Sequence, residues 1–127
     1  MHIELKDSLP FVSVTVAYKG ASLHIPDILI DTGSCSTILS ADIVSGIQLT
    51  PSPEDIIYTI RGVGGSEVVF SRTVDFLRVG EKTLSDFQIE IGGMDYGFDI
   101  NGILNMDFLI TSKAFINLQS MDLRFAS

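Results

Sequence analysis

The stretch LIDTGSCSTIL, residues 29–39, places one aspartate between an apolar strand and a polar turn. Three apolar residues, 28–30, lead up to Asp31, and apolar residues return after the turn. Apolar surroundings disfavour a charged carboxylate, so they raise its pKa unless a neighbouring group donates a hydrogen bond. The hydroxyls of Thr32 and Ser34 and the nearby backbone N–H groups are the available donors. Asp31 is therefore a candidate functional carboxylate, and the plainer alternative is an Asx turn.

Outward from this stretch, most of the chain alternates between apolar and polar residues with a period of two, which predicts β-strands. The expected strands are residues 11–20, 21–30, 68–80, 87–93 and 121–125. Pro26 lies inside the second of these and predicts an edge or a bend there. Hairpin turns are expected at 80–82 and 119–120.

Only two stretches have a helical pattern. Residues 40–46 begin with a serine and end at a glycine, which is typical of a short capped helix. Residues 103–111 form the second predicted helix, in which Leu104 and Phe108 are four positions apart and share a face. Six or more short strands with two short helices predict a closed or folded-over β architecture.

Length and composition limit the class of protein. The chain has 127 residues, of which 46% are hydrophobic, and we expect a single domain over residues 1–127. Eight basic against sixteen acidic residues give a net charge of −8. This balance argues against a nucleic-acid partner, which favours a basic surface, and against contact with an anionic membrane.

Localisation is predicted from three observations. The N-terminal residues 1–10 lack the apolar run of a signal peptide. No stretch approaches the roughly 20 apolar residues that span a bilayer. Cys35 is the only cysteine, so it forms no intramolecular disulfide. A reducing compartment is the simpler interpretation, and we expect a cytoplasmic protein.

Other catalytic chemistries find little support in the sequence. The chain contains no CxxC, HExxH or paired-histidine spacing for a metal, and we interpret His24 as a surface or rim residue. It contains no G-x-S-x-G nucleophile motif. The apolar neighbours of Cys35 predict a buried, unreactive thiol. The glycine-rich segment GVGGSE, residues 62–67, lacks the lysine of a phosphate-binding loop. We expect no metal and no cofactor.

Two further segments bear on function. IRGVGGSEVVF, residues 60–70, has three glycines in four positions at the tip of a predicted hairpin. It is either a plain turn or a mobile flap that closes over a ligand and lets its backbone approach closely. INGILNMDFL, residues 100–109, is a second apolar segment that carries Asp107, and by itself it predicts only core.

These three segments, in this order, resemble the retropepsin-like aspartic proteases, which are single-domain enzymes of retroviral type and their cellular and bacterial relatives. LIDTGSCSTILS resembles the active-site segment of that family, RGVGGSE its flap, and GILNMDFL the late segment that leads into its only regular helix. The resemblance extends from about Phe11 to Phe125. It implies an all-β, closed or folded-over barrel with a flap hairpin and one short C-terminal helix, and it implies an aspartic endopeptidase.

The resemblance also assigns roles to individual residues. Asp31 would be the catalytic carboxylate. The supporting residues of the catalytic loop would be Thr32, Gly33 and Ser34. The flap that covers a peptide substrate would consist of Gly62, Val63, Gly64 and Gly65. The walls of the substrate pocket would include Ile103 and Leu104.

Departures from the family pattern occur at three positions. Asn105 stands where the family usually has glycine, and asparagine tolerates a left-handed backbone better than most residues. In retroviral members an aspartate and an arginine pair with each other, and here Cys35 and Met106 stand at those two positions. Because both charged partners are absent together, no unpaired charge is buried. These replacements favour the cellular and bacterial branch. Asn105 also supports an alternative, a non-catalytic dimerisation or peptide-binding module with the same fold.

Hydrolysis by carboxyl groups alone needs two of them around one water, and this chain contains a single D-[ST]-G, at Asp31. The second carboxylate must therefore come from another copy, which predicts a C₂ homodimer with both Asp31 side chains on the axis. The resemblance implies the same, with Thr32 hydroxyls bonding across the interface and terminal strands pairing the subunits. The remaining alternative is an unrelated β domain in which D-T-G is only a turn.

Overall fold

The computed structural model describes residues 1–62, 65–94 and 99–126. Within these residues the strands are β1 (Glu4–Lys6), β2 (Leu9–Tyr18), β3 (Ala21–Ile30), β4 (Ile38–Ser40), β5 (Ile57–Gly62), β6 (Gly65–Val79), β7 (Lys82–Gly92), β8 (Gly102–Leu104), β9 (Ala114–Asn117) and β10 (Asp122–Phe125). The helical elements are α1 (Ala41–Val44), the 3₁₀ turn η1 (Ser45–Ile47) and α2 (Met106–Thr111).

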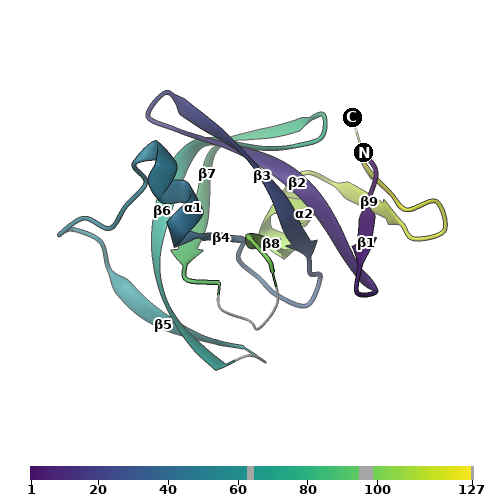
Figure 1. Cartoon of the computed structure of the whole chain (residues 1–127). Coiled ribbons are helices and arrows are strands. Elements are labelled where there is room, and N and C mark those ends of the chain that lie inside the picture. The colour runs from purple at the N-terminus through teal and green to yellow at the C-terminus, as the bar shows by residue number, and fades with distance from the viewer. Residues whose placement is uncertain (63–64, 95–98, 127) are drawn as a thin grey trace.

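Eight of the strands form one sheet in the order β1-β2-β3-β8-β4-β7-β6-β5. An additional antiparallel pairing joins β2 to β6, with Val16 opposite Leu77, so that the sheet folds over into a ring (Figure 1). Two short pairings inside the ring are parallel, β3 with β8 and β4 with β7. The predicted folded-over β architecture is therefore confirmed.

The β2–β3 hairpin follows the predicted strands closely. Val14 pairs with Ile25 but Val12 pairs with Ile28, so β3 carries one extra residue between these two pairs. This β-bulge lies at Pro26, where the sequence predicted a bend, and a bulge suits a residue that has no N–H for the ladder.

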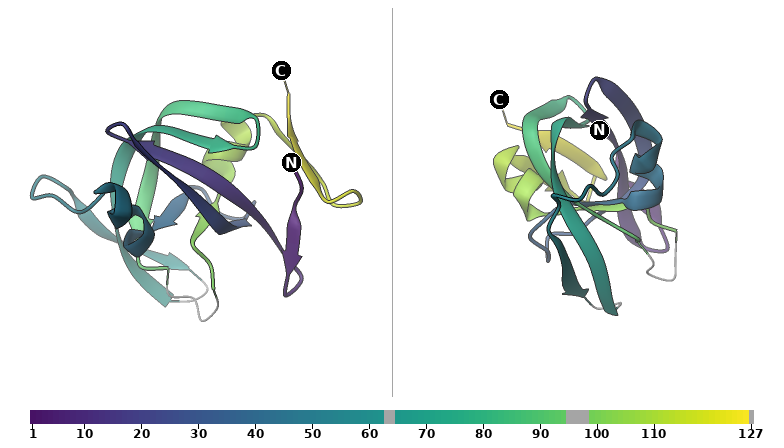
Figure 2. Two further views of the ribbon diagram at one scale, coloured as in Figure 1. Left: turned by 45° about the horizontal axis from the view of Figure 1, so that its top comes forward. Right: turned by 90° about the vertical axis from the view of Figure 1, so that its left-hand side faces the viewer.

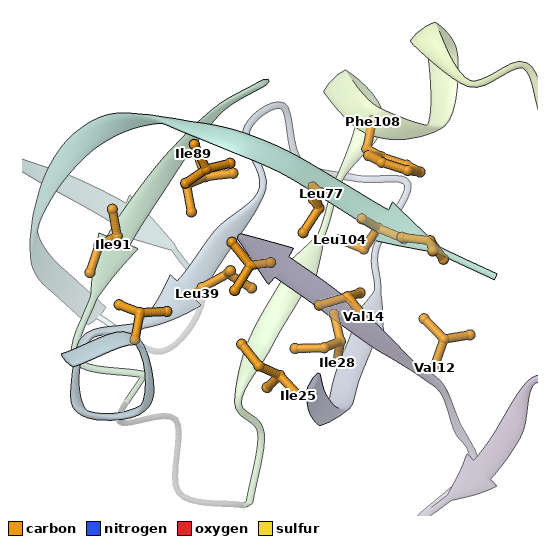
Figure 3. Close-up of a cluster of buried hydrophobic side chains, with 14 of the residues drawn as sticks. Val12, Val14, Ile25, Ile28, Leu39, Leu77, Ile89, Ile91, Leu104 and Phe108 are labelled. Atoms are coloured by element: carbon orange, nitrogen blue, oxygen red, sulfur yellow. The ribbon is translucent and has the colours of Figure 1, made fainter. Parts of the chain in front are cut away.

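The alternating pattern directs one face of each strand into the ring, where the main core forms. Figure 3 shows these side chains gathered between the strands. Those with essentially no exposed surface include Val14, Ile25, Ile28, Leu39, Leu77, Ile89, Ile91, Leu104 and Phe108. The Phe108 ring closes the core edge-on against Phe87 on β7 and Phe125 on β10, with ring centroids 5.6 and 6.4 Å apart.

The second predicted helix, 103–111, is wrong at its start. Residues 102–104 form strand β8, and α2 begins only at Met106. Ile103 is opposite Leu29 on one side and Ile38 on the other, so the strand is paired along both edges. Backbone pairing on both sides outweighs the local helical pattern. The first predicted helix, 40–46, forms as α1 followed by η1, but the Ser40 side chain makes no capping hydrogen bond and the helical turn continues past Gly46 to Ile47.

Residues 1–3 pair with residues 121–123, close to the two chain ends that Figure 2 marks. The N–H of Leu123 donates to the carbonyl of Met1 and the N–H of Ile3 to that of Met121, both at 2.8 Å. The β5–β6 hairpin extends away from the ring (Figure 1). In the part of the chain that the structure describes, no helix has the length and apolar character needed to cross a membrane.

Candidate active site

Asp31 is the first residue after β3, and the sheet positions its backbone. Its N–H donates to the carbonyl of Leu104 at 3.0 Å, which extends the parallel pairing of β3 with β8 by one bond. The side chain is half-buried. Its Oδ1 accepts the N–H of Gly33 at 2.8 Å, and its Oδ2 accepts the hydroxyl of Ser34 at 3.0 Å. Two of the donors that the sequence suggested are thus in place, whereas the Thr32 side chain is exposed.

The presence of glycine at position 33, in the D-T-G segment, has a steric explanation. A Cβ added at Gly33 would lie 3.1 Å from Oδ1 of Asp31, which is tighter than ordinary contacts of that kind. A larger residue would push the carboxylate away from the N–H that it accepts. Gly33 therefore permits the close approach of the backbone to its own aspartate.

The loop after Asp31 is held by the start of α2. The N–H of Met106 donates to the carbonyl of Ser34, and the N–H of Asp107 donates to that of Cys35, both at 3.0 Å. The first N–H groups of a helix have no partner within the helix. The loop carbonyls satisfy two of them, so the helix and the loop fix each other.

Thr37 and Asp107 complete this attachment. The Asp107 carboxylate accepts the N–H of Thr37 at 2.9 Å and its hydroxyl at 2.6 Å, and it also accepts the N–H of Phe108 at 2.7 Å. Thr37 has no exposed surface. From the sequence, the segment that carries Asp107 was predicted to form only core. Its place in the first turn of a helix, where acidic residues are favourable, was the signal that could have indicated a specific role for Asp107.

Asn105 adopts an extended backbone, with φ −112° and ψ −172°. The tolerance of asparagine for a left-handed backbone is therefore not used at this position. Its N–H donates to the hydroxyl of Thr37 at 3.1 Å, and its side-chain Nδ2 donates to the carbonyl of Ser36. Asn105 is 3% exposed, and its Oδ1 is the one buried side-chain polar atom without a hydrogen-bond partner among the residues that the structure describes.

Two sequence interpretations concern candidate ligands and nucleophiles. Cys35 is exposed, so the prediction of a buried thiol is wrong, because the loop turns its side chain outward while its carbonyl binds α2. His24 is exposed on β3, as predicted. Over residues 1–62, 65–94 and 99–126 the side chains of His, Cys, Asp and Glu form no cluster of three that could hold a metal.

The predicted flap coincides with the β5–β6 hairpin. Gly62 and Gly65 are opposite each other at its end, and Val63 and Gly64 lie outside the described residues. Of the two predicted pocket-wall residues, Ile103 is half-buried and Leu104 has no exposed surface. Only Ile103 therefore has side-chain surface available to a ligand in the single subunit.

A second hydrophobic cluster, separate from the main core, reaches the residues beside Asp31. Its buried members are Phe11, Ile38, Val69, Met94 and Ile100, and Leu9, Leu29, Tyr58 and Ile103 pack on it partly buried. Leu29 is two residues before Asp31, and Tyr58 and Val69 belong to the β5–β6 hairpin. The cluster therefore supplies apolar surface between the loop and the hairpin. Most of this cluster was not predicted from the sequence, because its members come from seven separate segments.

A cavity of about 330 Å³ lies between β7 and α2. It is lined by Ser36, Phe87, Gln88, Ile89, Glu90, Asp107 and Thr111. Burial of the carboxyl group and the negative charge of Asp107 raise the pKa of Glu90 above its ordinary value of 4.5. Both effects favour the protonated form of Glu90 relative to a solvent-exposed glutamate.

Comparison with known proteins agrees with this geometry. The sequence model of the family described as aspartyl protease matches residues 12–108, which include the loop, the hairpin and the start of α2. Among solved structures, a retropepsin-like aspartic protease from Rickettsia conorii is similar, with a TM-score of 0.69 over 97% of this chain and 95% of that chain. The two sequences are 14% identical, so the likeness is one of fold. No curated protein sequence matches the chain significantly.

Proposed function

The chain belongs to the aspartyl protease family and has the retropepsin-like fold, and from this membership we propose that it is an aspartic endopeptidase that acts as a homodimer. The observation that carries the proposal is the setting of Asp31. Its half-buried carboxylate is held by Gly33 and Ser34 at the end of β3. A carboxylate fixed in this way is oriented before a substrate arrives.

The proposed reaction is attack of a water molecule on a peptide carbonyl between two Asp31 carboxyl groups. One carboxylate accepts a proton from the water as its oxygen attacks, and the other, protonated, donates to the carbonyl oxygen. Like charges about 3 Å apart do not ionise together, so the pair shares one proton. The two groups then titrate as a coupled dyad rather than as separate residues.

The dimer follows from the count of such segments, because the 127 residues contain one D-[ST]-G. We propose that residues 1–127 form a single domain and that two copies meet on a two-fold axis through Asp31. Thr32, which is exposed beside Asp31, would bond to its counterpart across that axis.

We propose that the substrate is a peptide in extended conformation between the dyad and the β5–β6 hairpin, bonded through its backbone as an added strand. The flap would be Gly62, Val63, Gly64 and Gly65. Ile103 and the neighbouring second hydrophobic cluster would form the pocket wall, which favours apolar side chains next to the cleaved bond.

The decisive experiment is cleavage of a mixed peptide library between pH 4 and pH 7 by the wild-type chain and by Asp31→Asn. We expect the substitution to lower cleavage at least about a hundredfold, because an amide neither accepts nor supplies the catalytic proton. The matched control is Asp42→Asn, an exposed aspartate in α1, which should cleave like the wild type.

Two results would contradict the proposal. Cleavage that survives Asp31→Asn would remove Asp31 from the mechanism. A stable wild-type dimer that cleaves nothing would instead favour the non-catalytic module. The feature that supports this alternative is Asn105, which stands where the family usually has glycine.

A further inference from the structure

The strand that ends at Asp31 changes its inward-facing residues halfway along. In the first half of β3 the odd-numbered residues Leu23 and Ile25 face the main core, whereas in the second half the even-numbered Ile28 and Ile30 do. Ile25 and Ile28 are three positions apart, yet both belong to the core side chains of Figure 3. Successive side chains of a regular strand point to opposite faces, so residues three apart would not share one. The β-bulge between them reverses the phase of the strand.

The phase after the bulge decides on which face Asp31 lies. Leu29 is two residues before Asp31 and therefore on the same face. It is opposite Phe11, and both residues belong to the second hydrophobic cluster rather than to the main core. Without the extra residue in β3, the period of two would turn Asp31 toward the main core and Ile30 away from it.

The hairpin turn fixes the phase of the first half of β3. Five consecutive residue pairs join β3 to β2 next to this turn. The turn residues Lys19 and Gly20 both have positive φ, 48° and 85°, and a two-residue turn of this kind sets the register of its hairpin. An uninterrupted ladder would keep that register and bring Asp27, instead of Ile28, opposite Val12.

Asp27 is the residue of the bulge with a left-handed backbone, at φ 60°. A common class of bulge likewise contains one left-handed residue, usually glycine. Aspartate adopts this conformation more readily than most residues, and β-branched residues are genuine outliers there. The backbone at position 27 thus has the conformation that a bulge requires and that few side chains tolerate.

Two neighbours hold the bulge. The carbonyl of Pro26 accepts Nδ2 of Asn101, and the carbonyl of Asp27 accepts the backbone N–H of Asn101, both at 2.9 Å. Asn101 directly precedes β8, which pairs with the second half of β3. On the other side, the Asp27 carboxylate pairs with Lys6 of β1. The role of Asp27 can therefore lie in its backbone conformation or in its charge, and glycine at this position separates the two.

We propose that Asp27 is a positioning residue, whose left-handed backbone reverses the phase of residues 28–31 and so directs the Asp31 carboxylate to its loop instead of the core. The backbone conformation at position 27, rather than the carboxylate of Asp27, carries this effect. The proposal rests on the proposed function only in treating Asp31 as the catalytic carboxylate.

Thiol labelling measures the phase without reference to activity. The background is Cys35→Ser, which removes the exposed native thiol, and it carries either Ile28→Cys or Leu29→Cys. Ile28 has no exposed surface and Leu29 is half-buried on the other face. In the folded chain, diluted until its mass is that of a monomer, the thiol at position 29 should react at least about tenfold faster than the one at position 28. Deletion of Asp27 should reverse this order, whereas unfolding makes the two rates equal.

Substitutions at position 27 separate conformation from charge and decide the matter if the deletion variant fails to fold. Asp27→Gly loses the ion pair but accepts the left-handed backbone, so the ratio of the two labelling rates should stay within about twofold of the background. Asp27→Val should lower this ratio about fivefold or more, because valine is disfavoured at positive φ. The matched control is Lys113→Val, an exposed residue after α2 with φ 54°, which should keep the ratio.

Two results overturn the role of Asp27. One is a folded deletion variant in which the thiol at position 29 still reacts faster than the one at position 28. The other is the same ratio of labelling rates in Asp27→Val and Asp27→Gly, since the conformation at this position would then make no difference.

Peptide cleavage separates failure of this inference from failure of the proposed function. If the chain cleaves peptides, Asp27→Gly should keep kcat within about twofold and Asp27→Val should lower it about fivefold or more. A reversed labelling order with unchanged cleavage would remove Asp31 from the mechanism while the phase stands. An unreversed order with normal cleavage contradicts the role of Asp27 while the protease function stands. If the chain cleaves nothing, the labelling measurement still decides.

Discussion

Thr37 and Asp107, single residues 70 positions apart, fix the loop that carries Asp31. Three hydrogen bonds end on the Asp107 carboxylate, and two of them come from Thr37, which is fully buried. The Thr37 hydroxyl also accepts the N–H of Asn105. Hydrogen bonds to a charged group are stronger than neutral ones, and their loss leaves buried polar groups without partners.

Thr37→Val removes the hydroxyl and keeps the shape, so it leaves Asp107 short of a donor and the N–H of Asn105 short of an acceptor. We expect the free energy of unfolding to fall by about 1–3 kcal/mol, and cleavage to fall with it because the Asp31 loop loosens. Urea unfolding measures the first effect. Thr83→Val, at an exposed position on β7, should change stability by less than about 0.5 kcal/mol. Equal stability of the two variants would contradict the role given to Thr37.

At the level of elements, β8 is the central piece, although it has only three residues. It lies between β3 and β4, its end accepts the N–H of Asp31, and it leads directly into α2. A Cβ at Gly102 would lie 2.7 Å from the carbonyl oxygen of Ile38 and 2.9 Å from Cδ1 of Ile28. The strands close around β8 only because this position is a glycine.

Gly102→Ala should therefore separate β8 from its neighbours and lower the free energy of unfolding by about 1–3 kcal/mol. The matched control is Gly46→Ala in η1, where an added Cβ meets nothing within 4 Å. That variant should be as stable as the wild type or slightly more stable. Thermal unfolding of both variants tests this, and a Gly102→Ala chain as stable as the control would show that β8 has room to move.

At the level of the whole molecule, the ring of strands presents one Asp31, so half of the proposed catalytic centre belongs to each chain. Each chain has a formal charge of −8, and two of them approach against mutual repulsion. Added salt screens such repulsion over a distance of about 10 Å at 0.1 M. Assembly and activity should therefore depend on both concentration and ionic strength.

Mixing tests the shared centre directly. We expect an equal amount of Asp31→Asn chain, allowed to exchange subunits, to lower the activity of the wild-type chain to about half, because random pairing places half of the wild-type chains in mixed dimers. Asp42→Asn chain added in the same way should not lower it. An unchanged rate after proven subunit exchange would mean that a single subunit is sufficient.

The sequence by itself determined the features that depend on local pattern. Alternation of apolar and polar residues marked the long strands, and the apolar run before Asp31 marked the end of a strand with a carboxylate beside it. Pro26 predicted an edge or a bend in β3, and the structure has a β-bulge there. These features are encoded within a few neighbouring residues, since a period of two or a proline constrains the backbone wherever the segment lies.

Only the tertiary structure decided the features that join distant segments. Residues 103–104 read as helix but form a strand, because Leu29 and Ile38 pair with β8 from both sides. Cys35 read as buried but is exposed, because its loop is turned by its bonds to α2. The contacts of Asp107 with Thr37, and of Glu90 with Tyr58, join residues 70 and 32 positions apart. No local pattern encodes such partners, since they become neighbours only when the strands close into a ring.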